Sequence, residues 1–143
     1  MHADVREPDT ILRLAGESLD FTKPVALSLV ALTHYLSEDP AGDDVYGLLK
    51  RYVSELVPGS CLILSQVTPD LSPEAIAKAA EHFRRSGTPF YPRSLAEFSR
   101  FFDSLELLGP GVIPVSGWRP GPEDVAAQAE GIVPVYAGVA RKP

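Results

Sequence analysis

One apolar run constrains the fold more than any other part of the chain. It covers residues 24–36, reads PVALSLVALTHYL, and carries the polar cluster Thr33, His34 and Tyr35 near its end. A strand that is buried on both faces of a sheet is continuously apolar, and in open α/β sheets ligands bind just beyond the carboxyl ends of the strands. The run therefore predicts a buried strand over 24–32 that is followed by a functional edge.

A helix and a second strand follow this run. Apolar residues recur every three or four positions over 42–57, which predicts a helix with one apolar face, and Pro58-Gly59 ends it. A second apolar run over 61–67 predicts the next strand. Two strands that are joined through a helix in this way are parallel, with a right-handed crossover. Residues 24–67 therefore predict an α/β fold.

Shorter signals complete the expected domain. Helix start and stop residues predict helices that begin at Pro8, after Ser72-Pro73 and after the capping box of Ser94 and Glu97. Short strands are predicted at 105–108, 112–115 and 133–140, and a surface loop rich in Gly and Pro at 116–131.

Composition excludes several classes of function. The 143 residues, 45% apolar and 22% charged, are enough for a single domain, 1–143, that folds without a metal or a disulfide. A net charge of -6 argues against nucleic acid and anionic membranes as partners. Cys61 lies in an apolar run and is expected to be a reduced core residue. With no long apolar stretch and no signal-like start, we expect a cytoplasmic protein.

The sequence contains no recognisable catalytic or metal-binding motif. The histidines His2, His34 and His82 are dispersed, so no metal site is predicted. The G-x-S-x-G, Walker A and G-x-G-x-x-G motifs are absent. His34 is nevertheless a candidate acid or base because it lies at the predicted sheet edge, and holding the loop is its alternative role. Asp4 is either a helix-capping residue or an acceptor for a ligand.

Three further residues are candidate ligand contacts. Tyr91 and Arg93 precede the capping box, and Trp118 lies beside Arg119 in the 116–131 loop. An aromatic ring next to a cation can bind a substrate or anchor a packed loop, and both interpretations remain open for each of them.

An ordered set of short motifs resembles one family of enzymes. The motifs are ADVREP at 3–8, LDF at 19–21, PVAL at 24–27, LTHYL at 32–36, PGS at 58–60, LS at 64–65, RS at 93–94, FFD at 101–103, WRP at 118–120 and YAGVARK at 136–142. Together they are similar to the carboxyl-terminal part of class I S-adenosylmethionine-dependent methyltransferases. The resemblance covers nearly the whole chain.

The resemblance implies an α/β fold with a truncated Rossmann-like methyltransferase sheet, in which parallel strands are followed by a C-terminal antiparallel strand pair. The family orders its strands 3-2-1-4-5-7-6, and residues 2–5, 24–32 and 61–67 would be strands three, four and five. Strands one and two have no counterpart. The glycine-rich turn and the acidic residue that hold the cofactor's methionine part and ribose would therefore be missing, which leaves an incomplete cofactor site.

The resemblance also implies roles for particular residues. Asp4, Val5 and Thr33 match positions that bind the cofactor, and His34 and Tyr35 match the catalytic segment. We expect Tyr91, Arg93 and Trp118 to contact the substrate. S-adenosylmethionine is the implied cofactor, and we expect the isolated chain to bind it weakly or not at all.

Three functions stay open at this point. The first is a methyltransferase homologue that acts on a small molecule, with His34 as the base. The second is a cofactor-independent cyclase or isomerase that acts on a small apolar metabolite. The third is a noncatalytic interaction protein that uses an open sheet edge.

The open edge follows from the same resemblance. Strand four pairs with strand one in the family, so the strand over 24–32 would have an unpaired side. A second copy of the chain, a partner chain that supplies the missing strands, or residues 1–7 could cover it. We favour a homodimer as the sequence-based expectation.

Overall fold

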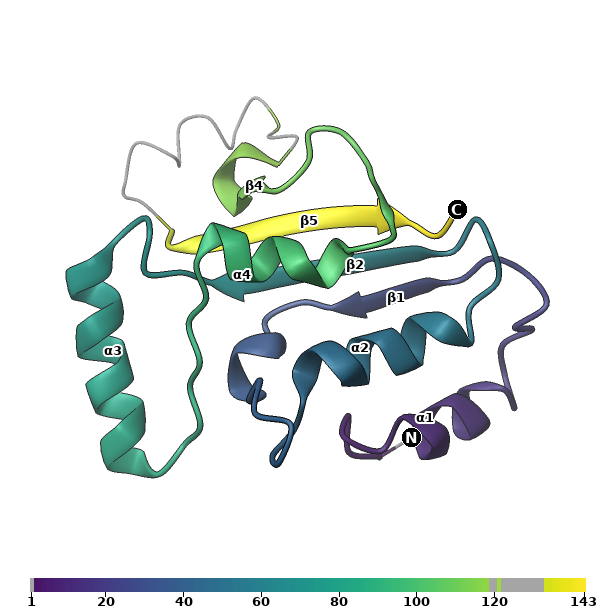
Figure 1. The fold of residues 1–143 in the computed structure, drawn as a ribbon, viewed down its shortest axis with the longest axis horizontal. Helices are drawn as coiled ribbons and strands as arrows, with labels where there is room; N and C mark the ends of the chain where they lie inside the picture. Colours follow the sequence, from purple (N-terminus) through teal and green to yellow (C-terminus); the bar gives the residue numbers. More distant parts are fainter. Residues whose placement is uncertain (1, 119–120, 122–132) are drawn as a thin grey trace.

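A mixed sheet forms the centre of the protein (Figure 1). The structure is a computed structural model that describes residues 2–118, 121 and 133–143. The strands are β1 (Ala26–Leu29), β2 (Cys61–Val67), β3 (Glu106–Leu107), β4 (Ile113–Pro114) and β5 (Val135–Arg141), in the order β1-β2-β5-β3, with β4 also paired to β5. β1 and β2 are parallel, whereas β5 is antiparallel to its three neighbours. This confirms the predicted parallel unit and the antiparallel C-terminal strands.

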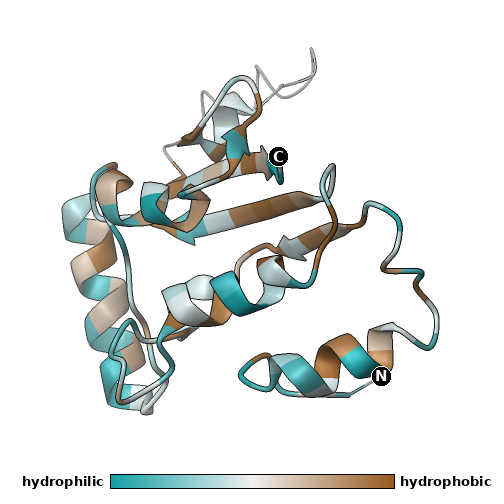
Figure 2. Cartoon of the chain, turned by 45° about the vertical axis from the view of Figure 1, so that its right-hand side comes forward, coloured by the Kyte–Doolittle hydropathy of each residue, from teal (hydrophilic) through white to brown (hydrophobic). Residues whose placement is uncertain are grey.

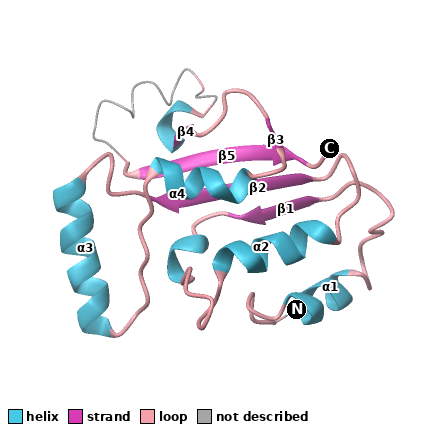
Figure 3. Cartoon of the chain, viewed as in Figure 1, coloured by secondary structure: helices cyan, strands magenta, loops and turns pink. Residues whose placement is uncertain are grey.

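Helices and short turns connect these strands (Figure 3). The α-helices are α1 (Pro8–Ala15), α2 (Val45–Ser54), α3 (Pro73–Ser86) and α4 (Leu95–Ser99), and the 3-10 turns are η1 (Thr33–Tyr35), η2 (Arg100–Phe102) and η3 (Val115–Gly117). The capping box predicted at the start of α4 is present, and α3 ends at Gly87 in a left-handed conformation, with φ 71°. Both ends follow from local sequence, so they were predictable.

The core lies between one face of the sheet and the helices α2 and α4. Its buried members come from the strands, from α2 and from the aromatic stripe of α4 and η2, and they include Leu29, Leu62, Leu64, Leu48, Leu49, Tyr52, Phe98, Phe101, Phe102 and Tyr136. The apolar strands β2 and β5 run through the middle of the molecule (Figure 2). α3 stands apart from this core at one end of the sheet, and only Ile76 of that helix is buried (Figure 1).

The two faces of the sheet are covered unequally. On the side of α2 and α4, alternate positions of β2 and β5 are all buried: Leu62, Leu64, Gln66, Tyr136, Gly138 and Ala140. On the opposite side, Ser65 is buried, but Cys61, Ile63, Val67, Val135, Ala137 and Val139 are only half-buried. Adjacent residues of a strand point to opposite faces, so among the described residues this second face is less covered than the first.

Two predicted strands differ from the structure. The strand expected over 24–32 is confined to Ala26–Leu29, where Ala26 and Ser28 are exposed, so it is not buried on both faces. It ends where Ala31 adopts a left-handed conformation, with φ 56°. Residues 2–5 do not form strand three. The carbonyl of Asp4 accepts a hydrogen bond from the N–H of Glu7 and forms a turn instead. A strand requires a paired neighbour, and none of the described strands pairs with this segment.

Other expectations are confirmed in part. Cys61 is a free cysteine, but it is half-buried and not a core residue, because it lies on the less covered face of the sheet. The loop predicted over 116–131 begins within η3, and most of it lies outside the described residues. Among the described residues, no helix has both the length and the apolar character needed to cross a membrane.

We predict that Gly138→Ala destabilises the fold. A Cβ at this position would lie 2.8 Å from Cζ of Phe102 and 3.2 Å from Cγ2 of Val112. Phe102 is itself buried against Phe98, so relieving the overlap disturbs the core, at a cost of about 1–3 kcal/mol in unfolding free energy. Urea denaturation measures this loss. Gly42→Ala, whose Cβ would make ordinary contacts of 3.5 Å or longer, is the matched control, and equal stability of the two variants would contradict the prediction.

Candidate functional site

The carboxyl ends of β1 and β2 lie at the same edge of the sheet, and η1 follows β1 directly (Figure 1). At the turn between them, the N–H of Ala31 donates to Oγ of Ser65 on β2, over 2.9 Å. This contact fixes the left-handed Ala31, a conformation that non-glycine residues rarely adopt and that is enriched at functional sites. The turn places Thr33 and His34 in the interior.

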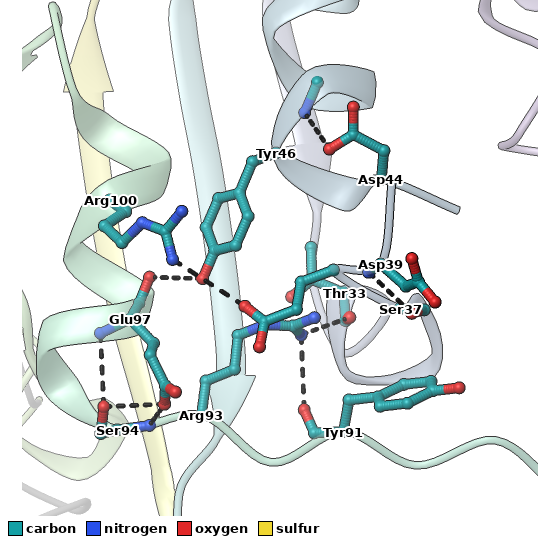
Figure 4. A network of polar contacts seen from close by, with 12 residues as sticks. Thr33, Ser37, Asp39, Asp44, Tyr46, Tyr91, Arg93, Ser94, Glu97 and Arg100 are labelled. Carbon is teal, nitrogen blue, oxygen red and sulfur yellow. Dashed lines mark hydrogen bonds and ion pairs between the residues drawn. The ribbon is translucent and has the colours of Figure 1, made fainter. Parts of the chain in front are cut away.

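A buried guanidinium, that of Arg93, holds this edge together (Figure 4). Its Nη1 donates to the carbonyl of Thr33 over 2.9 Å and to Oε1 of Gln66 over 3.2 Å, and its Nη2 donates to the carbonyl of Leu36 over 2.7 Å. The backbone N–H of Arg93 also donates to the carbonyl of Val67. Arg93 therefore connects η1, the end of β2 and the segment that leads into α4.

Gln66 completes this network from β2. It is fully buried, and its Oε1 accepts a hydrogen bond of 2.8 Å from Oγ1 of Thr33. Its Nε2 donates to the carbonyls of Val67 and Tyr91, each over 3.0 Å. Gln66 was not identified from the sequence. The only available signal was a polar side chain within an apolar strand, and such a side chain needs buried partners.

His34 is the buried titratable group of this edge. It is 5% exposed, and its Nδ1 has no hydrogen-bond partner among the described residues. Its carbonyl accepts a hydrogen bond of 2.7 Å from the N–H of Tyr91. Burial, and secondarily the positive charge of Arg93, lower the pKa of His34 below its ordinary value of 6.5. The imidazole is therefore neutral near neutral pH and can accept a proton.

Aromatic rings from three segments surround this imidazole. The ring of Tyr35 lies 4.4 Å from that of His34, and the ring of Phe90 lies 5.9 Å away in an edge-on arrangement. Phe90 stacks on Phe83 of α3 with ring centres 4.5 Å apart. Tyr91 follows Phe90 in the chain, and its side chain is 39% exposed. The edge thus combines one buried imidazole with neighbouring aromatic rings.

The predicted cofactor residues Asp4 and Val5 are tied to α2. The hydroxyl of Tyr52 donates to the carbonyl of Val5 over 2.8 Å, while the carboxylate of Asp4 is half exposed and pairs with Arg6. Asp43, which the sequence did not single out, links this segment to the site. Its carboxylate accepts from Nε of Arg6 and from the N–H of Ser37, which follows η1. These two bonds help to lower the pKa of Asp43.

The structure therefore brings together some of the predicted site residues and separates others. Thr33, His34, Tyr35, Tyr91 and Arg93 form one cluster, in which Arg93 is 3% exposed and directs its donors to backbone carbonyls and Gln66. Trp118 follows η3 and is half-buried, and its neighbour Arg119 lies outside the described residues. The assigned roles of all these residues stay predictions.

Two further features bear on what the site can bind. Within the described part of the chain, no group of three His, Cys, Asp or Glu residues is arranged to hold a metal ion. A cavity of about 290 Å³ lies away from this edge, between α2 and η2, and its lining includes Leu49, Val53, Phe101 and Leu105. None of the predicted site residues lines it.

Comparison with known proteins places the whole chain in one family. The family model described as S-adenosyl methyltransferase matches residues 1–143. No curated protein matches the sequence. The full-length match confirms the resemblance that the short motifs indicated.

Two solved structures have the same fold. One is a DUF574 family protein from Streptomyces avermitilis, with 32% sequence identity and a TM-score of 0.93, over 100% of this chain and 54% of that chain. The other is a candidate methyltransferase from Thermobifida fusca, with 33% identity and a TM-score of 0.82, over 99% of this chain and 53% of that chain. The chain thus spans about half the length of these two relatives.

We predict that Arg93→Met lowers the free energy of unfolding by about 3 kcal/mol, because several buried carbonyls lose a charged donor. Urea denaturation gives this value. Arg85→Met is the control, since the Arg85 side chain is 74% exposed and forms only a surface ion pair, so its loss changes stability by about 0.5 kcal/mol or less. Similar small effects for both variants would show that the Arg93 network is not structural.

We also predict that His34 makes stability depend on pH. The unfolded chain protonates this imidazole near its ordinary pKa of 6.5, whereas the folded chain does so only at lower pH. The unfolded state therefore binds more protons below this value, and the unfolding free energy falls as the pH decreases. Urea denaturation between about pH 7.5 and pH 5 should show a smaller decrease for His34→Gln than for wild type. His82→Gln, at an exposed position of α3, is the control variant, and a wild-type slope for His34→Gln would refute the prediction.

Proposed function

The chain belongs to the S-adenosyl methyltransferase family, and we propose that it forms the acceptor side of a methyltransferase that acts on a small molecule. One observation carries the proposal. The buried imidazole of His34, whose Nδ1 has no partner among the described residues, lies at the sheet edge where open α/β folds bind their ligands. The family implies S-adenosylmethionine as the cofactor.

The residues at this edge could contact one part of the cofactor and the methyl acceptor. S-adenosylmethionine supplies an activated methyl group. The rings of Tyr35 and Tyr91 offer aromatic surface to a purine or to a flat acceptor. Asp4 is half exposed, so its carboxylate is accessible to a ligand's amine, and Asp43 ties its segment to the loop after η1. The exposure of Asp4 supports it as a cofactor contact, and we propose Val5 and Thr33 beside it from the family resemblance.

His34 acts as the general base in this proposal. Burial keeps its imidazole neutral, so Nδ1 can accept a proton from a hydroxyl or amine of the acceptor as that atom is methylated. Arg93 is buried, and we assign it a positioning role: it binds the carbonyls of Thr33 and Leu36, which precede and follow His34 in the chain. Most of the catalytic effect in such a reaction comes from orientation of donor and acceptor.

The cofactor site of the isolated chain is incomplete in this proposal. The chain spans about half the length of its relatives, and the short motifs gave no counterpart for the glycine-rich turn or the ribose-binding acid. The missing contacts mean that the chain alone binds the cofactor weakly. The weak binding of the cofactor that remains should occur at the contact residues that this chain itself provides.

A ligand titration tests this proposal. S-adenosylhomocysteine, added to ¹⁵N-labelled chain, should shift the amide signals of residues 4–5 and 31–37 in NMR spectra, with weak, saturable affinity. His34→Gln should reduce the shifts around η1, whereas His82→Gln, on the exposed side of α3, should not. Shifts confined to the cavity between α2 and η2, or no shifts at all, would refute the proposal.

A further inference from the structure

We infer that the cavity between α2 and η2 is a second ligand site, which binds a small organic anion with an apolar body and one carboxylate. The cavity has a volume of about 290 Å³. An apolar cavity of about 150 Å³ takes up one benzene ring, so this one has room for a ring and a short side chain. None of the predicted site residues lines the cavity, so the inference does not depend on the role of His34.

α2 supplies one wall of the cavity with two neighbouring rows of side chains. Leu49 and Val53 form an apolar row, and Tyr46, Lys50 and Ser54 form a polar row beside it. Residues four apart lie on the same face of a helix, so both rows follow the helix axis, and the polar row extends over about 12 Å. This wall therefore offers an apolar floor with polar groups along its rim.

The opposite wall comes from η2 and the segment after it. Phe101 and Leu105 add apolar surface there, and Arg100 lines the same side. The ring of Phe101 stacks on that of Tyr46, with ring centres 4.5 Å apart, which connects the two walls. Binding sites for small organic molecules are typically apolar hollows with a few polar groups that set the orientation of the ligand. The two walls together have this composition.

The lining of the cavity is mainly cationic, although the chain as a whole is acidic. The sequence has 13 Lys and Arg residues against 19 Asp and Glu residues. At the cavity this balance is reversed. The cationic lining side chains are Lys50, Arg100 and Lys142, and the acidic one is Asp103. A hollow with low-dielectric walls and an excess of one charge attracts ligands of the opposite charge, so the cavity favours an anion.

Lys142 fixes one of these charges at the end of α2. Its Nζ donates to the carbonyls of Val53, Ser54 and Leu56, over 3.0, 3.3 and 2.6 Å. These bonds use the three N–H donors of the ammonium group, and carbonyls do not neutralise its charge. Lys142 therefore contributes a positive field to the cavity and leaves direct contact with the ligand to other residues.

Arg100 and Lys50 are the groups that we assign to the carboxylate. Cζ of Arg100 lies 4.0 Å from the ring centre of Tyr46, so the aromatic ring supports the guanidinium (Figure 4). The ion pair of Arg100 with Glu38 is long, at 3.8 Å, and the Arg100 side chain is 56% exposed. Lys50 is exposed as well. A guanidinium binds a carboxylate through two parallel N–H donors, and an ammonium adds a further charged donor.

Other kinds of occupant use only part of this lining. An inorganic anion would meet the cations but leave the apolar walls in contact with water. A neutral apolar molecule would fill the walls but gain nothing from the cationic side chains. A carboxylate with an apolar body uses both features, and its body lies between Leu49 and Val53 on one side and Phe101 and Leu105 on the other.

Titration with a matched pair of ligands tests the inference. 3-Phenylpropanoate carries a carboxylate on an apolar body, and 3-phenylpropanamide has nearly the same shape without the charge. Added to the ¹⁵N-labelled 143-residue chain, the carboxylate should bind saturably, with a Kd of about 1 mM or below. It should shift the amide signals of residues 46–54 and 100–105 in NMR spectra. The uncharged amide should bind about tenfold more weakly, because it loses both cationic contacts.

Variants of the lining localise the charge effect. Lys50→Met and Arg100→Met should each weaken binding of the carboxylate about two- to fivefold, since each removes one partly exposed charge contact. Asp103→Asn should strengthen it about twofold by removing the acid of the lining. Lys78→Met, at an exposed position of α3, is the matched control and should leave the affinity unchanged. Circular dichroism checks that all four variants fold.

Three outcomes would overturn the inference. Equal affinity for the carboxylate and the amide would show that the cationic lining does not select the ligand. The absence of saturable binding would show that the cavity is not a ligand site. Shifts at residues 31–37 without shifts at 46–54 and 100–105 would place the carboxylate at the sheet edge instead. The S-adenosylhomocysteine titration follows residues 4–5 and 31–37, so a failure of the proposed function and a failure of this inference are distinguishable.

Discussion

The buried guanidinium of Arg93 is the interaction on which the functional edge depends. It binds carbonyls from the turn after β1 and the amide oxygen of Gln66 on β2. Its central carbon, Cζ, also lies 5.6 Å from the ring centre of Phe101 in the core. A buried cation is stable only when most of its donors have partners, so the surrounding chain is held in one arrangement. The same charge contributes to the lowered pKa of His34. Burial is the larger cause of the lowered pKa of His34, so Arg93 accounts for only part of it.

Local signals in the sequence predicted the ends of several helices and one buried strand. β2 was expected at 61–67 and lies at Cys61–Val67, and the capping box before α4 and the glycine stop after α3 are present. The strand expected at 2–5 is absent, and the one expected over 24–32 is short. Strands require partners that are distant in sequence, and apolar pattern alone does not reveal whether a neighbouring strand exists.

The candidate site, like the fold, was only partly predictable from the sequence. The polar cluster after the apolar run located His34, because its position at a strand end is a property of the sequence. Gln66 and Asp43, which bind the neighbouring Thr33 and Ser37, were not found, since a single polar residue in a strand or loop carries no pattern. The sequence also did not reveal that the donors of Arg93 bind the carbonyls of Thr33 and Leu36, and its expected contact with the substrate stays a prediction. The burial of Arg93 is set by tertiary packing, which no local pattern shows.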